Sequence, residues 1–186
     1  IKQKGSQGSK HLTTLLDDPF ITGFDGFAYI QLEKIRVYTP DLQLIGESSK
    51  GIQGLSGQLP KHLYKVSSNR KGIDRLKAND VLWISDQHVP LYSTLVPIGG
   101  LRLAGYLEII INPAFNLPNI SEITKTPVSV FSISGKNINL NEKDAIKGYL
   151  PVEFLLHTTD NKPAFRIVGY ENVEHLDQQM VNTQIV

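Results

Sequence analysis

The sequence predicts an α+β protein: an antiparallel sheet flanked by helices, followed by a second, smaller module of similar plan. Segments with the two-residue period of strands alternate with segments that have the period of helices. Short turns rich in glycine, proline or aspartate join neighbouring strand-like segments, which must therefore be antiparallel. The order of elements seen before residue 113 also recurs, in shorter form, after residue 126.

The composition is that of an ordinary globular protein, with 186 residues of which 40% are hydrophobic and 20% charged. Its 19 basic and 18 acidic side chains leave a net charge of +1, which points to neither nucleic acid nor an acidic membrane surface as partner. The absence of cysteine excludes disulfides and thiolate metal sites. No signal-peptide pattern or transmembrane-length window is present, and the abrupt ends lead us to expect a fragment of a larger protein.

The N-terminal segment, residues 1–28, is expected to be a linker with one short helix. Residues 1–9 are polar and contain glycine, so we expect them to fray. Ser9 can cap a helix that runs through Leu16 and ends ahead of Pro19.

Residues 30–58 predict a hairpin followed by an irregular loop. The run YIQLEKIRVY alternates apolar and polar residues, and its slip in phase at Glu33 and Lys34 indicates a β-bulge or a late strand start. The turn sequence TPDLQ then joins residues 31–39 to a second strand at residues 43–48. The loop SKGIQGLSGQ is rich in glycine and serine.

One helix and three strands complete the first module, which we place at residues 29–114. The helix is predicted over residues 59–78, with Pro60 in its first turn and a break near Gly72. The strands are predicted to start at Asp80, Val89 and Leu101. The dipeptides QH and GG between them have the length of two-residue hairpin turns.

The last of these strands reads LRLAGYLEIII and is apolar on both faces. It is too short to cross a bilayer, which takes about 20 apolar residues. We therefore expect one face to pack on helices and the other to line a core or pocket. Leu107 and Ile109 should be buried, and Arg102 should lie beside Tyr106 on one face.

Residues 115–170 predict the smaller module, built from two further hairpins. Its strand-like segments are PVSVFSIS, NINLN, YLPVEFLLHT and KPAFRIVGYE, with a short helical segment NEKDAIKG between the second and the third. Residues 171–186 place Val173, Leu176 and Met180 on one face and predict a helix directed towards the membrane.

No catalytic or metal-binding constellation is visible in the sequence. The five histidines are scattered without an HExxH pattern, and there is no P-loop, no G-x-S-x-G and no G-x-G-x-x-G after a strand. We therefore expect no enzyme activity, no metal site and no cofactor, and a hydrolase with dispersed residues is the least favoured hypothesis. The basic run RKGIDRLK, from Arg70 to Lys77, is interpreted as a solvated helix face.

The stretch VLWISDQHVPLYSTLVP, followed by VPIGGLRLAGYLEIIINP, resembles the closing strands of extracytoplasmic Cache-type sensor domains, the PAS-like input modules of bacterial membrane receptors. The family's "G-Y-L-x-hydrophobic" strand corresponds to Gly105, Tyr106 and Leu107, with Asn112 near its end. The front hairpin IRVYTPDLQLIGES resembles the family's opening hairpin.

The likeness covers residues 30–113 and, more loosely, 127–170, which implies a double Cache arrangement. It implies a ligand-sensing periplasmic domain of an inner-membrane signalling protein whose output domain is a histidine kinase, a diguanylate cyclase or a chemotaxis transducer. The implied partners are a small-molecule ligand and a membrane anchor, not nucleic acid, and a homodimer is left open. The competing hypothesis is a periplasmic protein-interaction or scaffold module without a small ligand.

The predicted ligand site consists of Trp83, Tyr92, Arg102, Tyr106, Tyr64 and Asp86. Trp83 is either a core aromatic or a pocket wall, and Asp86 either a solvated hairpin tip or a ligand contact. Arg102 can hold a small organic anion such as a carboxylate, or else pair with Glu108 or another acid on the sheet surface. Amino-acid-binding Cache modules carry arginine two residues before a tryptophan, where this chain has Val81, so an amino acid is disfavoured. A cavity at these residues would favour the sensor, and its absence the scaffold.

Overall fold

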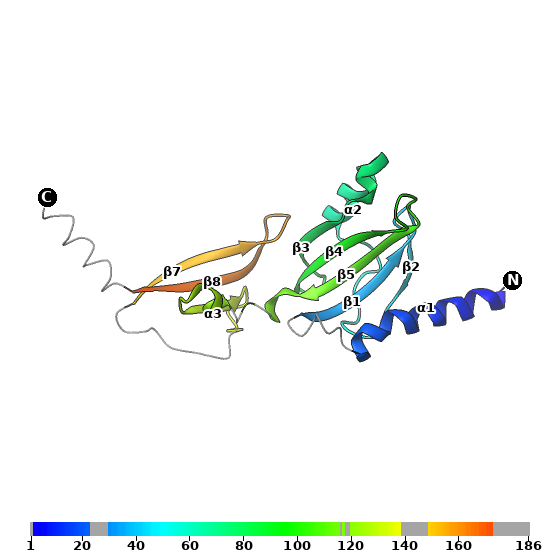
Figure 1. The fold of residues 1–186 in the computed structure, drawn as a ribbon. Coiled ribbons are helices and arrows are strands. Elements are labelled where there is room, and N and C mark those ends of the chain that lie inside the picture. The colour runs from blue at the N-terminus through cyan, green and yellow to red at the C-terminus, as the bar shows by residue number, and fades with distance from the viewer. Residues whose placement is uncertain (1, 23–29, 116, 118–119, 139–148, 173–186) are drawn as a thin grey trace, which may run out of the picture. The chain divides into compact units, whose positions relative to one another are not determined.

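The computed structural model describes residues 2–22, 30–115, 117, 120–138 and 149–172 (Figure 1). The chain divides into two compact units. Unit 1 comprises residues 1–115 and 158–161, and unit 2 comprises residues 116–157 and 162–186. In each unit the described strands form one antiparallel sheet.

Unit 1 has a five-stranded sheet in the order β2-β1-β5-β4-β3, with every neighbouring pair antiparallel. Its elements in chain order are α1 (Lys2–Thr22), β1 (Gln31–Tyr38), β2 (Leu44–Glu47), α2 (Lys61–Asn69), the 3-10 helix η1 (Gly72–Leu76), β3 (Asn79–Ile84), β4 (Pro90–Ile98), β5 (Gly105–Asn112) and the 3-10 helix η2 (Pro113–Phe115). The predicted α+β class, with an antiparallel sheet and flanking helices, is confirmed.

Unit 2 is the predicted smaller module, and its described strands form a three-stranded sheet in the order β6-β8-β7. Its described elements are α3 (Ile120–Thr124), β6 (Val128–Ser132), β7 (Tyr149–His157) and β8 (Pro163–Asn172). The short helix expected at NEKDAIKG lies outside the described residues, as does the C-terminal helix from residue 173 onwards. Glu171 and Asn172 belong to β8, so the prediction that the helix starts at residue 171 is wrong.

The N-terminal helix α1 is much longer than the predicted helix from Ser9 to Leu16, and it includes residues 2–9, which were expected to fray. The helix continues past Pro19, which removes only one backbone hydrogen bond, while Leu16 and Asp17 are buried one turn earlier. Tertiary burial therefore outweighs the local stop signal. Among the described residues, no helix is both long enough and apolar enough to span a bilayer.

The predicted bulge in β1 is confirmed, because its pairing with β5 shifts register between Leu32 and Lys34. The extra residue turns Leu32 and Lys34 to opposite faces of the sheet, although they are two positions apart. From Lys34 onwards, every second residue of β1 points to the face that α2 covers, which we call the α2 face.

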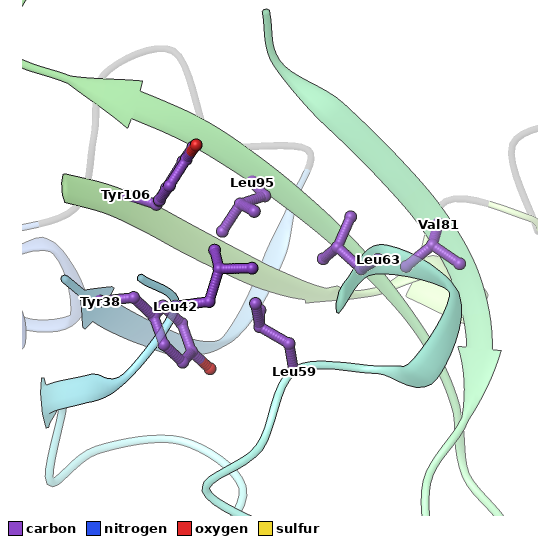
Figure 2. Packing of buried hydrophobic residues seen from close by; sticks show 7 residues of the cluster. All are labelled: Tyr38, Leu42, Leu59, Leu63, Val81, Leu95 and Tyr106. Carbon is purple, nitrogen blue, oxygen red and sulfur yellow. The ribbon is translucent and has the colours of Figure 1, made fainter. Parts of the chain in front are cut away.

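The α2 face carries the core of unit 1, which Figure 2 shows in close view. Its members are Tyr38, Leu42, Leu59, Leu63, Val81, Leu95 and Tyr106. The segment predicted over residues 59–78 has its predicted break near Gly72, because α2 ends at Asn69 and η1 starts at Gly72. Arg70 and Lys71 are extended between the two helices, and Gly72 has a φ of +53°.

The opposite face of the sheet is covered by α1, and we call it the α1 face. A Cβ atom on Gly46 of β2 would lie 2.8 Å from Leu12 Cδ2, so the helix runs close over this edge. Leu107 and Ile109 point to the α1 face and are only half-buried, so the prediction of full burial is wrong. The buried apolar residue of this strand is Ile110, on the α2 face.

Two hairpin turns are longer than predicted. Between β4 and β5 the turn takes six residues, 99–104, and is closed by Ala104, whose amide donates to the Ile98 carbonyl at 2.8 Å. Gly99 and Gly100 have φ values of 109° and 61°, but they only begin this turn. Between β3 and β4, three residues form the turn, and the last of them, His88, has a φ of 61°.

Candidate functional site

A groove of about 440 Å³ lies beside α2 in unit 1. Three segments line it: the turn between β1 and β2, the C-terminal half of α2, and the connection from α2 into η1. The lining residues are Pro40, Asp41, Leu42, Tyr64, Ser67, Ser68, Arg70, Lys71, Gly72 and Arg75. Its volume falls in the range of small-molecule sites, about 300 to 1,000 Å³. We call it the basic groove.

The charges that line the basic groove are three cations and one carboxylate. Arg75 donates from Nη2 to the Pro40 carbonyl at 2.8 Å, which ties η1 to the turn between β1 and β2. Arg70 donates from Nη1 to the Lys77 carbonyl at 2.6 Å. Lys71 is exposed, and its side chain has no hydrogen bond or ion pair with any described residue. The groove is therefore electropositive, and Asp41 is its one negative side chain.

Hydroxyl groups complete the polar lining. Ser67 is only 5% exposed, and its Oγ has no hydrogen-bond partner among the described residues. The neighbouring Ser68 hydroxyl, by contrast, donates to the Lys65 carbonyl at 3.2 Å. An unpaired buried hydroxyl costs about 1 to 3 kcal/mol, so Ser67 is a polar group for which the described residues supply no partner.

The sequence analysis missed the basic residues of the groove. The run from Arg70 to Lys77 was interpreted as a solvated helix face, but Arg70, Lys71 and Arg75 line the groove, because the helix ends before them. The signal that could have found them is the stretch SSNRKG, in which two serines and an asparagine precede two cations and the glycine that marks the break in the helical segment.

The predicted site residues are not brought together. Trp83 and Tyr106 lie on the α2 face, where Tyr106 belongs to the core and Trp83 packs against it, with Trp83 Nε1 donating to Ser93 Oγ at 2.8 Å. Tyr92 points to the α1 face and donates to Asp80 Oδ2 at 2.6 Å. That hydrogen bond, together with partial burial, raises the pKa of the Tyr92 phenol to about 12.

The other three predicted residues are exposed. Arg102 lies in the turn between β4 and β5, so the predictions that it sits beside Tyr106 or pairs with Glu108 are both wrong. Asp86 is at the tip of the hairpin between β3 and β4. Tyr64, which is 49% exposed on α2, is the one member of the predicted set that lines the basic groove. Its role in ligand binding stays a prediction.

A buried polar network lies on the α2 face, and the sequence analysis did not anticipate it. Arg36 donates from Nε to Glu47 Oε2 at 2.9 Å, and its Nη1 lies 3.8 Å from Glu108 Oε2. Arg36 and Glu108 are fully buried, and Lys34 is 2% exposed. Lys34 Nζ donates to the carbonyls of Ser48 and Lys50 at 3.0 and 3.3 Å.

Burial sets the ionisation of this network. Desolvation raises the pKa of Glu108, although the hydrogen bond from Tyr38 and the charge of Arg36 oppose the shift. Desolvation lowers the pKa of Lys34 for the same reason. Among the described residues, no cluster of three or more histidine or acidic side chains could hold a metal ion.

Among known proteins, only solved structures show a similarity to this chain. No family model matches the chain, and no curated protein matches it. The periplasmic domain of Vibrio cholerae LuxQ is similar over 90% of this chain and 82% of its own, with 10% sequence identity and a TM-score of 0.47.

Two ligand-bound receptor domains are also similar. The ligand-binding domain of the Pseudomonas aeruginosa amino acid chemoreceptor PctC, in complex with GABA, matches over 90% of this chain and 92% of its own, with 10% identity and a TM-score of 0.33. The ligand-binding domain of Mlp24 with asparagine matches over 95% and 80%, with 14% identity and a TM-score of 0.37.

Proposed function

We propose that the chain is a ligand-sensing extracytoplasmic domain of a membrane-bound signalling protein, and that unit 1 binds a small organic anion in the basic groove. The observation that carries the proposal is the set of three cations, Arg70, Lys71 and Arg75, around a groove of about 440 Å³. Lys71 supports it most directly, because no described residue neutralises its charge.

The proposed ligand class is the one that the sequence suggested, but the residues differ. An organic anion was expected at Arg102, which the structure places in an exposed turn. The basic groove supplies cations from the connection between α2 and η1 instead, and adds Tyr64 as an aromatic wall. Guanidinium groups suit such a ligand because they stay charged and donate in pairs.

The groove is connected to α1 through β2. Its wall at Pro40 to Leu42 is the turn that leads into β2, and beyond β2 the chain reaches Ser49 and Lys50. The amides of these two residues donate to Asp17 Oδ1 on α1 at 2.7 and 3.1 Å. A ligand that shifts the turn would therefore act on α1 without any chemical step.

A protein-interaction module without a small ligand is the second candidate. One observation favours it: on the α2 face, where a pocket between Trp83 and Tyr106 was expected, Tyr106 is 3% exposed and part of the apolar core. A domain with that region filled can still present its surface to another protein.

Thermal unfolding at low ionic strength, with a panel of small organic anions, tests the proposal. An anion at 100 times its Kd should stabilise the wild type by about 2.7 kcal/mol. Lys71→Gln should abolish this stabilisation without disturbing the fold, because no described residue pairs with the Lys71 side chain. Lys65→Gln is the matched control, since Lys65 is exposed on α2 and does not line the groove. If no anion stabilises the wild type, the interaction module is favoured.

A further inference from the structure

The basic groove is suited to one class of anion in particular. We propose that it recognises a phosphoryl group, so that its ligand is a small phosphate monoester. This inference rests on the proposed function and names the ligand class for the same groove. Charge, donor groups and shape each support it.

The charges of the lining match a phosphoryl group better than a carboxylate. Arg70, Lys71 and Arg75 exceed the single carboxylate, Asp41, by two positive charges. A phosphate monoester carries roughly −1.5 to −2 charges at neutral pH and three strong acceptor oxygens. A monocarboxylate would leave part of the positive charge of the groove uncompensated, whereas a phosphoryl dianion neutralises it.

The donor groups point to the same ligand. Ser67 lines the groove and is only 5% exposed. Its hydroxyl has no hydrogen-bond partner among the described residues. Arg75 uses one guanidinium nitrogen on the Pro40 carbonyl, and its other nitrogens have no partner in the described structure. A phosphoryl group presents three oxygens in different directions and can accept from Lys71 and Arg75. The Ser67 hydroxyl is buried beside the groove and becomes a third donor when it rotates towards the ligand.

The ordinary reason for cations after a helix is their attraction to its C-terminal dipole. That reason covers Arg70 and Lys71, which directly follow α2. It does not cover the unpaired hydroxyl of Ser67, which lies within α2. Arg75, in the last turn of η1, donates to the Pro40 carbonyl through one nitrogen, and its other guanidinium nitrogens have no partner among the described residues.

The groove also has room for the organic part of an ester. Its apolar wall is formed by Pro40, Leu42 and the ring of Tyr64. An ester with a flat or short apolar body can place its phosphoryl group against the cations and its body along this wall. We therefore expect a monoester to bind more tightly than inorganic phosphate.

Phenyl phosphate and benzoate form a matched pair of probes, because they share the ring and differ in the anionic head. Titration calorimetry with the whole chain at equal ionic strength should show phenyl phosphate binding about tenfold more tightly than benzoate, in keeping with the stronger charge-assisted hydrogen bonds. Inorganic phosphate should bind more weakly than phenyl phosphate and compete with it.

Two variants and one control locate the site. Lys71→Gln should weaken phenyl phosphate binding about tenfold or more, while Lys65→Gln should leave it unchanged. Ser67→Ala should also weaken binding, yet without ligand its thermal midpoint should equal or exceed that of the wild type, because an unpaired buried hydroxyl has been removed. A merely structural serine would show the opposite, a lower midpoint with unchanged binding.

The outcomes separate the two proposals. Benzoate binding as tight as phenyl phosphate, and lost in Lys71→Gln, would overturn the phosphoryl inference and keep the anion sensor. No binding of either probe, or binding indifferent to both variants, would overturn the groove as a site. Vesicles of phosphatidylcholine with phosphatidic acid assign the source: binding that depends on Lys71 supports a lipid headgroup, and phenyl phosphate binding without vesicle binding supports a soluble ester.

Discussion

Tyr38 on β1 donates a hydrogen bond of 2.8 Å to Glu108 Oε2 on the neighbouring strand β5, and both side chains are fully buried. The bond links the apolar core to the buried polar network, because Tyr38 belongs to the core and Glu108 also faces Arg36. The second oxygen of the Glu108 carboxyl group, Oε1, has no hydrogen-bond partner among the described residues.

The variant Tyr38→Phe should therefore lower the free energy of unfolding by about 1 to 3 kcal/mol, since it leaves the buried Glu108 with one donor fewer. Urea denaturation measures the loss. Tyr92→Phe is the control, because its hydroxyl bonds to Asp80 at an exposed position and should cost no more than about 0.5 kcal/mol. Equal costs for the two variants would contradict the buried network.

The raised pKa of Glu108 predicts how stability depends on pH. Burial raises this pKa above its ordinary value of 4.5, so between the two values the folded state binds more protons than the unfolded state. Its contribution to stability is thus complete below pH 4.5 and is lost as the pH rises through the raised pKa. As the pH rises from 4.5 through the raised pKa, the free energy of unfolding of the wild type should fall relative to that of Glu108→Gln. If the free energies of the two proteins instead change in parallel with pH, the pKa of Glu108 is not raised.

Ile110 and Leu107 allow a direct comparison of the two faces of β5. Ile110 is fully buried on the α2 face, and Ile110→Ala should cost about 2 to 5 kcal/mol through lost burial and a residual cavity. Leu107→Ala should lower the free energy of unfolding by less, because Leu107 is only half-buried on the α1 face. Denaturation midpoints of the two variants in the opposite order would mean that the α1 face is the better packed.

Asp17 should hold the loop after β2 against α1. Its carboxylate accepts hydrogen bonds from the amides of Ser49 and Lys50 and from the Ser49 hydroxyl, at 2.7, 3.1 and 2.6 Å. Hydrogen exchange at these two amides should speed up by roughly tenfold in Asp17→Ala. Asp18→Ala, a change at the exposed neighbouring residue, should leave exchange unchanged.

The same contact predicts an effect of acid. Burial acts to raise the pKa of Asp17, but the hydrogen bonds from Ser49 and Lys50 more than offset it, so the pKa is below its ordinary value of 3.8. The contribution of Asp17 is therefore present above pH 3.8 and lost as the pH falls through the lowered pKa. Protection of the two amides that persists well below that range would argue against the carboxylate as their acceptor.

The sequence by itself determined the features that depend on neighbouring residues. Alternation of apolar and polar side chains located the strands, the slip at Glu33 located the bulge, and Gly72 marked the break between α2 and η1. Each of these depends on backbone preferences or on a period that can be counted along the chain. The antiparallel sheet followed from the short connections between strands.

Only the tertiary structure decided where the charged residues lie. Lys34, Arg36 and Glu108 are charged residues that the fold buries within the sheet of unit 1. The loop after β2 supplies a backbone carbonyl to Lys34 and one to Arg36. Arg102 left the predicted site because its turn is six residues long. The basic groove is lined by residues 40–42 and by residues between 64 and 75, which lie in separate segments of the chain. A local sequence pattern cannot predict that these segments come together, because their proximity depends on how α2 packs against the sheet.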